Sequence, residues 1–293
     1  MFEQQLINAL TLGSVYALFA LGFTLVFGVL GVINLSHGAI FMLGSYIALL
    51  LVSQFQLSLW LAMAVAMLAC GALGMLVDFL VLRPLRRRNA PHLSPMIATI
   101  GVAIMITNIS QGLFGAENKR FPFGTIPEDS ISIGNLHLTA VQLAIVLISF
   151  ILMIVLLLVM RRTQLGRALR AIAESPKAAY LLGINVEGLF LLTSFAAAAL
   201  GGAAGVLVGL SFNAISPFMG QPMLHKGIAV IILGGMGDIR GAMIGGLFLG
   251  VAEVMSVAYL SSDFRDAVAF GLLFVILLVR PSGMFGKILE RKA

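Results

Sequence analysis

The chain has 293 residues, of which 60% are hydrophobic and only 10% are charged. Soluble proteins carry about 25% charged residues, so this composition, with a mean hydropathy of +1.08, excludes an ordinary soluble domain. The four histidines are scattered and the single Cys70 lies in an apolar run, which excludes a disulfide within the chain and a cysteine metal site.

Apolar runs of membrane-spanning length recur along the whole chain. In chain order they predict helical spans at 8–30, 37–53, 58–82, 94–114, 140–160, 188–210, 223–237, 241–260 and 264–281. The seventh is short and ends in the glycine-rich GGMGDIRG, so it is either a full span or a helix that re-enters the membrane. We therefore expect an all-α, polytopic helix bundle of eight or nine spans that forms one domain, 1–293.

A polar break, NLSHG at 34–38, separates the first two spans and has no basic flank. Irregular backbone at membrane depth is tolerated only where protein or a water-filled cavity satisfies its polar groups. Asn34 and His37 are therefore candidates to line a translocation pathway. The alternative is that they satisfy free carbonyl groups at the turn.

The other ionisable residues near spans are few. Glu253 lies well inside a span, where a carboxylate is a functional candidate by default, or it pairs with a neighbouring helix or subunit. Asp78 is expected to pair with the arginine cluster that follows it. Local rules also predict an ion pair between Asp238 and Arg240, and an external interfacial position for His225 and Lys226.

Two spans carry glycines at intervals of three and four residues, a pattern that lets helices approach closely. The glycines of this pattern are Gly201, Gly205 and Gly209 in one span and Gly241, Gly245 and Gly250 in the other. They predict tight packing or subunit association, and a pathway lined by bare backbone is the alternative.

Most of the 18 Lys and Arg residues lie in three groups, at 83–88, 161–177 and 280–292. The positive-inside rule places all three groups in the cytoplasm. The N-terminus is then expected outside and the C-terminus inside. The segment 115–139 becomes the largest external loop, which is either a plain connector or a surface that receives another protein.

An amphipathic segment at 164–183 follows the second basic group. Its charged residues recur at spacings of three and four and share one helical face: Arg167, Arg170, Glu174 and Lys177. Ser175 followed by Pro176 predicts the start of a second helix, and Gly183 predicts its end. We expect two short cytoplasmic helices that dock on a soluble partner.

The sequence contains no HExxH, GxSxG or GxxxxGK[ST] motif, so neither catalysis nor binding of ATP by a phosphate loop is expected of this chain. Energy for pumping must come from another polypeptide or from an ion gradient.

Three motifs resemble the permease subunit of branched-chain amino acid ABC importers, the LivH type. They are ALGFTLVFGVLGVINLSHGAIFMLGSY within 17–46, RAIAESPKAAYLLGIN at 170–185, and GGMGDIRGAMIGGLFLGVAE at 234–253. The resemblance runs from about residue 6 to residue 286.

The resemblance implies a type II-like importer in the bacterial inner membrane. The implied partners are a second permease (LivM-like, or another copy of this chain), two cytoplasmic ATPase subunits and a periplasmic solute-binding protein. Helices at 163–185 would couple the ATPases to the bundle. The partners would hydrolyse ATP, and this chain would bind no cofactor.

The expected function is inward transport of leucine, isoleucine, valine or related amino acids by alternating access. A urea or short-chain amide permease is an alternative within the same class. A stand-alone ion-coupled transporter or channel that uses Glu253 or His37 is an alternative from another class, and a structural membrane scaffold is a third.

Overall fold

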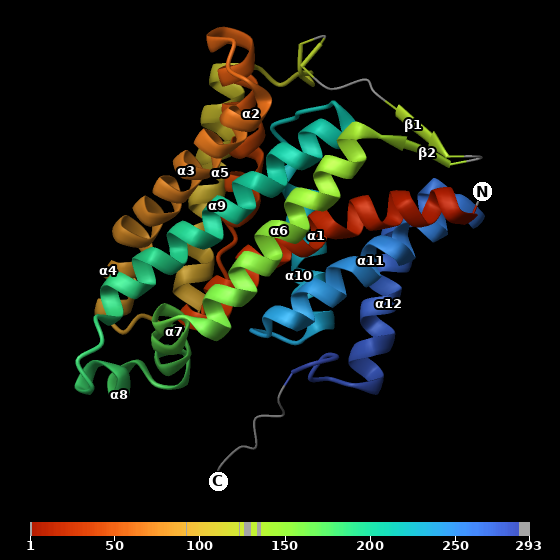
Figure 1. The fold of residues 1–293 in the computed structure, drawn as a ribbon. Coiled ribbons are helices and arrows are strands. Elements are labelled where there is room, and N and C mark those ends of the chain that lie inside the picture. Colours follow the sequence, from red (N-terminus) through yellow and green to blue (C-terminus); the bar gives the residue numbers. More distant parts are fainter. Residues whose placement is uncertain (1, 92, 123, 126–129, 134–135, 287–293) are drawn as a thin grey trace.

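The computed structural model describes residues 2–91, 93–122, 124–125, 130–133 and 136–286. Its long helices form a bundle (Figure 1): α1 (Phe2–Leu30), α2 (His37–Phe55), α3 (Leu59–Val77), α5 (Leu93–Phe114), α6 (Ala140–Arg162), α9 (Val186–Phe212) and α11 (Ile239–Tyr259). The shorter helices are α4 (Arg83–Arg87), α7 (Gln164–Glu174), α8 (Pro176–Leu181), α10 (Gly220–Gly234) and α12 (Arg265–Val279). A π-helical turn (Asp78–Leu82) joins α3 to α4, and a 3₁₀ turn (Ser262–Phe264) precedes α12. The strands β1 (Ser130–Ile133) and β2 (Leu136–Thr139) form an antiparallel hairpin in which Ser130 pairs with Thr139.

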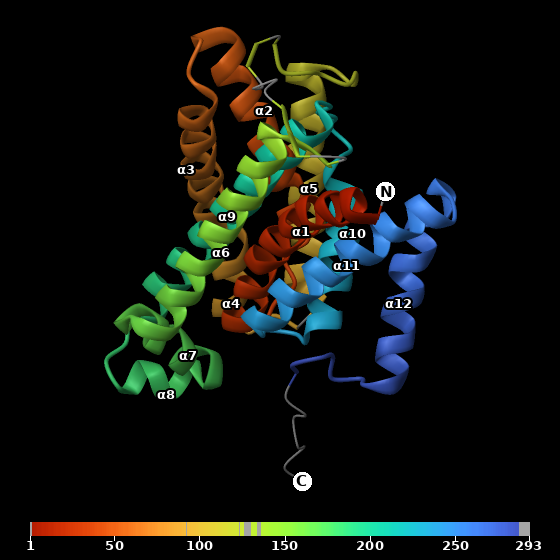
Figure 2. The ribbon, with the colours of Figure 1, turned by 45° about the vertical axis from the view of Figure 1, so that its right-hand side comes forward.

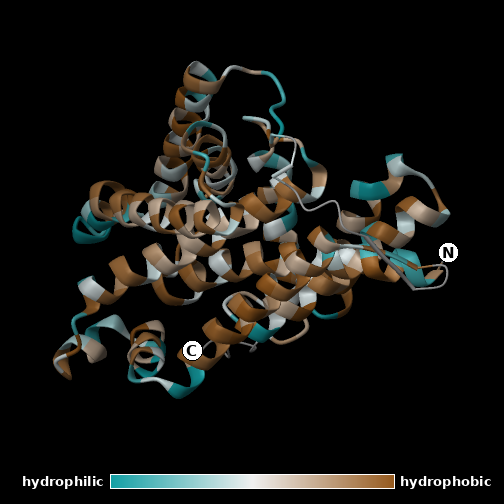
Figure 3. Ribbon diagram, turned by 45° about the horizontal axis from the view of Figure 1, so that its top comes forward, coloured by the Kyte–Doolittle hydropathy of each residue, from teal (hydrophilic) through white to brown (hydrophobic). Residues whose placement is uncertain are grey.

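Seven helices in the described part of the chain are long and apolar enough to cross a membrane, with Leu59–Arg87 counted as one. The predicted spans at 223–237 and 264–281 correspond to α10 and α12, which have 15 residues each and pack against α11. The prediction of eight or nine spans thus corresponds to seven long helices and two short ones. Figure 3 shows hydrophobic helix middles and hydrophilic segments towards the ends of the bundle, as expected of a multi-pass membrane protein.

The connecting segments gather at two ends of the bundle (Figures 1 and 2). The helices α4, α7 and α8 and the C-terminal end of α12 lie at one end, which we call the basic end. The start of α1, the β1–β2 hairpin and the α2–α3 connection lie towards the other. Arg280 belongs to the basic end, whereas Lys287, Arg291 and Lys292 lie outside the described residues. The basic groups are therefore segregated, and which end faces the cytoplasm stays a prediction.

The glycines of α9 lie where this helix crosses α2. A Cβ atom at Gly205 would collide with the carbonyl group of Phe41, and one at Gly201 would press on the ring of His37. Gly209 lies beside Ser45, whose hydroxyl donates to the carbonyl of Gly205 at 2.6 Å. Bare backbone at these positions lets α2 and α9 pack closely inside the chain.

The glycines of α11 contact two neighbouring helices, α1 and α10. A Cβ at Gly250 would collide with Gly13 of α1, whereas Gly241 and Gly245 face Gly234 and Val230 of α10. Because these contacts join helices of one chain, they account for the glycine spacing without a second subunit.

The starts of α6 and α5 show two local signals. Thr139 and Gln142 form a capping box at the start of α6. Ser94 lies inside α5, which already includes Leu93. Pro95 lies in the first turn, where its missing N–H group needs no helical partner.

Candidate coupling and translocation site

The helices α7 and α8 form a short arm at the basic end, joined at Ser175 as predicted. The Ser175 hydroxyl accepts a hydrogen bond from the Ala178 N–H at 3.3 Å, and Pro176 is the first helical residue. At the other end Gly183 has φ +80°, and the Ile184 N–H donates to the Ala179 carbonyl at 3.1 Å. This pairing ends α8 in a Schellman motif, which favours glycine at Gly183.

The arm has one face on the bundle and one free face. Leu169, Ile172 and Ala179 are buried, whereas Leu165 and Leu182 are exposed. The charged residues Arg167, Glu174 and Lys177 are exposed. These three side chains are available to a partner.

Arg170 differs from the other charged residues of the arm. Its guanidinium donates to the carbonyl of Met160 in the last turn of α6. A cation at a helix C-terminus satisfies a free carbonyl and interacts favourably with the helix dipole. Arg170 therefore fixes α7 to α6, a structural contact that its spacing did not reveal.

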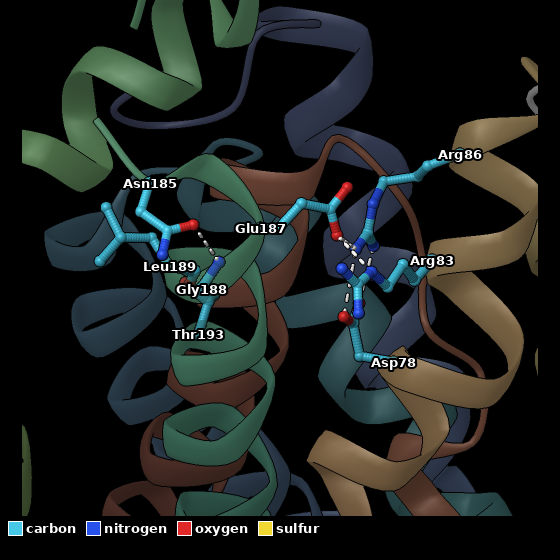
Figure 4. A network of polar contacts seen from close by, with 8 residues as sticks. All are labelled: Asp78, Arg83, Arg86, Asn185, Glu187, Gly188, Leu189 and Thr193. Atoms are coloured by element: carbon cyan, nitrogen blue, oxygen red, sulfur yellow. Dashed lines mark hydrogen bonds and ion pairs between the residues drawn. The ribbon is translucent and has the colours of Figure 1, made fainter. Parts of the chain in front are cut away.

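An ion-pair network joins α3, α4 and α9 beside the arm (Figure 4). Asp78 is fully buried, and Arg86 binds both of its carboxylate oxygens, at 2.7 and 3.1 Å. The predicted pairing of Asp78 with the arginine cluster is thus confirmed. The π-helical turn that begins at Asp78 adds a residue to the helical turn, a feature frequent at functional sites.

Glu187 completes this network from the first turn of α9. Its carboxylate lies 2.8 Å from Nε of Arg83 and 3.9 Å from the Arg86 guanidinium. The Arg86 guanidinium also lies 4.5 Å from the centre of the Phe190 ring. Sequence analysis missed Glu187. The signal was an acidic residue two positions after Asn185. Asn185 caps α9 by accepting from the Gly188 N–H at 3.0 Å.

The polar break after α1 runs inside the bundle. The Asn34 side chain accepts hydrogen bonds from the Ser36 N–H and hydroxyl, at 3.1 and 2.6 Å. His37 is buried, with Nε2 3.3 Å from the carbonyl oxygen of Phe19, in the middle of α1. Asn34 thus holds the break itself, whereas His37 joins the start of α2 to the middle of α1. Whether the two side chains also line a pathway stays a prediction.

Glu253 is the centre of a second buried ionic cluster. Its carboxylate accepts from the Tyr16 hydroxyl at 2.8 Å and lies 2.7 Å from Nζ of Lys226. Nε of Arg265 lies 3.1 Å from the same carboxylate. The structure thus shows the pairing alternative for Glu253. The Lys226 side chain is only 12% exposed, and its predicted position at the external interface stays a prediction.

Asp238 was expected to pair with Arg240. Instead, its carboxylate caps α11 by accepting from the Gly241 N–H at 2.8 Å. Capping explains why an acid follows the glycine-rich turn.

A groove of about 540 Å³ lies between the start of α2, α5 and α10. The break contributes Leu35 and Gly38 to its wall, and α2 adds Ala39. Most other lining residues are apolar, and the polar ones are Thr107, Asn108, Gln111, Gln221 and His225. The sequence pattern did not identify this groove, because helices distant in the chain form it.

Known proteins are similar in sequence to this chain along nearly its whole length. The LivH branched-chain amino acid permease of Salmonella typhimurium is 38% identical, covering 98% of this chain and 96% of the relative. The Pseudomonas aeruginosa permease BraD gives the same figures. The LivM permease of Escherichia coli is 26% identical, over 97% of this chain and 71% of the relative. No solved structure gives a significant match.

A family model described as branched-chain amino acid transport system / permease component matches residues 5–277. This match agrees with the multi-pass bundle and with the relatives, so the chain belongs to the family of branched-chain amino acid transport permease components.

Proposed function

We propose that this chain is the membrane-spanning permease of an ATP-driven importer for leucine, isoleucine, valine or related amino acids. The observation that carries the proposal is the α7–α8 arm, a capped and well-defined element at the basic end. Its charged residues are exposed, and Tyr180 and Leu181 beside them are also exposed. The names of the relatives support the class of solute.

The proposed assembly contains a second permease, two cytoplasmic ATPase subunits and a periplasmic solute-binding protein. The second permease resembles the LivM relative or is another copy of this chain. ATP is bound and hydrolysed by the ATPase subunits, which is consistent with the absence of a phosphate-loop motif from this sequence. The basic end faces the cytoplasm of a bacterial inner membrane.

The fold supports a mechanical route from the arm to the bundle. Only the turn at 182–185 separates α8 from α9. The close contact of α9 with α2 then connects this helix to the break at 34–38. A displacement of the arm by ATP-driven closure is therefore passed to the helices around the groove, and alternating access follows from two arrangements of the same bundle.

The test uses the complete transporter reconstituted in liposomes. Glu174→Arg reverses a charge on the free face of the arm, and we expect it to abolish the stimulation of ATP hydrolysis by solute. The matched control is Glu3→Arg, which reverses an exposed glutamate at the start of α1, outside both the basic end and the 115–139 loop, and is expected to retain that stimulation. Leucine uptake by the permease alone, driven by an ion gradient, would instead support a stand-alone secondary transporter.

A further inference from the structure

The groove between α2, α5 and α10 exposes polar side chains on a helix that crosses the membrane. Thr107 and Asn108 lie in the body of α5, and the Asn108 amide nitrogen donates only back to its own helix, at the Ile104 carbonyl, 2.8 Å away. Polar groups are costly against lipid hydrocarbon and are expected to face protein or water. The groove is therefore poorly suited to contact lipid.

The groove runs from one end of the bundle to its interior. Gln111 is in the last turn of α5, and this end of α5 lies away from the basic end (Figure 1). Gln221 is in the first turn of α10, which meets the break because Gly220 touches Gly38. Leu35 and Gly38 belong to the break beside the middle of α1. The groove thus connects the proposed external side with the irregular backbone at membrane depth.

The wall offers a mixed surface with little charge. Apolar side chains alternate with amide, hydroxyl and imidazole groups, and none of the lining residues is an aspartate, glutamate, lysine or arginine. At one point the wall is bare backbone, because Gly38 and Gly220 touch and a Cβ on either would collide with the other. A volume of about 540 Å³ lies in the range of about 300–1,000 Å³ typical of small-molecule sites.

We propose that this groove is the wall of the solute pathway, and that it accepts a small amino acid with no net charge and an apolar side chain. The inference rests on the proposed function and adds the site. The apolar wall contacts the side chain of the solute, and Asn108, Gln221 and His225 hydrogen-bond its ammonium and carboxylate groups. This assignment moves the pathway from Asn34, His37 and Glu253, whose side chains have polar partners within the chain, to the groove.

Single cysteines test the proposal in the complete transporter in liposomes. The native Cys70 is fully buried, so the background reactivity is low. Ala103→Cys and Ile104→Cys place thiols on the groove wall, at positions that make none of the proposed hydrogen bonds to the solute. Ile109→Cys is the matched control, because Ile109 is 52% exposed, lies next to Asn108 in α5 and is not part of the groove wall. The probe is a membrane-impermeant maleimide, and leucine uptake is measured before and after reaction.

We expect the two groove cysteines to react, the control to stay unreacted, and uptake to be lost only where the groove is modified. If the groove cysteines react no faster than the control, the groove is dry and the proposal is wrong. Reaction that leaves uptake unchanged also contradicts it. Thr107→Cys replaces any variant that fails to assemble. Wild-type uptake that does not depend on ATP would overturn the proposed importer, while the labelling pattern would still decide whether water enters the groove.

Discussion

At the scale of single residues, Glu253 shows how a carboxylate at membrane depth can be held by its own chain. Three groups from α1, α10 and α12 surround it, and Lys226 bridges Glu253 and the Tyr16 hydroxyl. Removing one partner of a buried ion pair leaves the other charge without compensation, which costs about 3–5 kcal/mol. The contribution of this cluster to the stability of the fold therefore explains why a carboxylate is present at Glu253.

Glu253→Gln should lower the free energy of unfolding by about 3–5 kcal/mol, because the Lys226 ammonium stays buried without its counter-charge. Asp266→Asn is the control: this carboxylate lies 3.8 Å from Lys226 but is 70% exposed, so the loss should stay within about 1 kcal/mol. Both are measured by denaturant unfolding of the purified permease. A Glu253→Gln protein of wild-type stability that no longer transports would restore the pathway interpretation.

The sequence located Glu253 but could not give its partners. Tyr16 lies 237 residues away in the chain, and only the packing of α1 on α11 brings the two together. Conversely, Asp78 and Arg86 are eight residues apart, so their pairing followed from local spacing. Short spacing alone was not sufficient, because Asp238 caps α11 where a pairing with Arg240 was expected.

At the scale of elements, the arm was predicted closely because its limits depend on neighbouring residues. Ser175, Pro176 and Gly183 each act within one helical turn. The helix limits that they set can therefore be predicted without knowledge of the fold. The groove was not predicted, because its three walls come from α2, α5 and α10. The role of Glu187 was also missed, since its partners lie about one hundred residues earlier in the chain.

The contact of α2 with α9 gives a prediction for one glycine. Gly205→Ala should destabilise the protein by about 1–3 kcal/mol, because the new methyl group collides with the Phe41 carbonyl and the helices must separate. Gly112→Ala in α5 is the control, since nothing lies within 4 Å of a Cβ there, and it should stabilise by up to about 1 kcal/mol. Thermal unfolding of both variants in detergent measures the difference. Equal effects would show that the two helices do not touch at Gly205.

The network of Figure 4 gives a second prediction for elements. Asp78→Leu should cost about 3–5 kcal/mol by stranding Arg86 in a site that is mostly buried, whereas Asp78→Leu combined with Arg86→Leu should cost less than the single change. Glu187→Gln should cost within about 1 kcal/mol, because this side chain is 38% exposed. Denaturant unfolding of the three variants measures their free energies of unfolding and so ranks them by stability. A double variant less stable than Asp78→Leu would contradict the ion-pair account.

At the scale of the whole molecule, the arrangement of basic residues sets the orientation that coupling requires. The groups at 83–88 and 161–177 share one end of the bundle with Arg280, and the start of α1 and the β1–β2 hairpin lie away from it (Figures 1 and 2). By the positive-inside rule we expect the first end in the cytoplasm. An arm on the other side of the membrane could not meet an ATPase that draws on cytoplasmic ATP.

This orientation predicts opposite labelling of two exposed positions. In spheroplasts, a membrane-impermeant maleimide should react with Glu117→Cys and should reach Lys177→Cys only after the membrane is permeabilised, because Lys177 belongs to the arm. The wild-type chain is the control for the buried Cys70. Immediate reaction at position 177 with protection at 117 would reverse the topology. The α7–α8 arm would then lie outside, and no route would remain by which a cytoplasmic ATPase could move α9 through it.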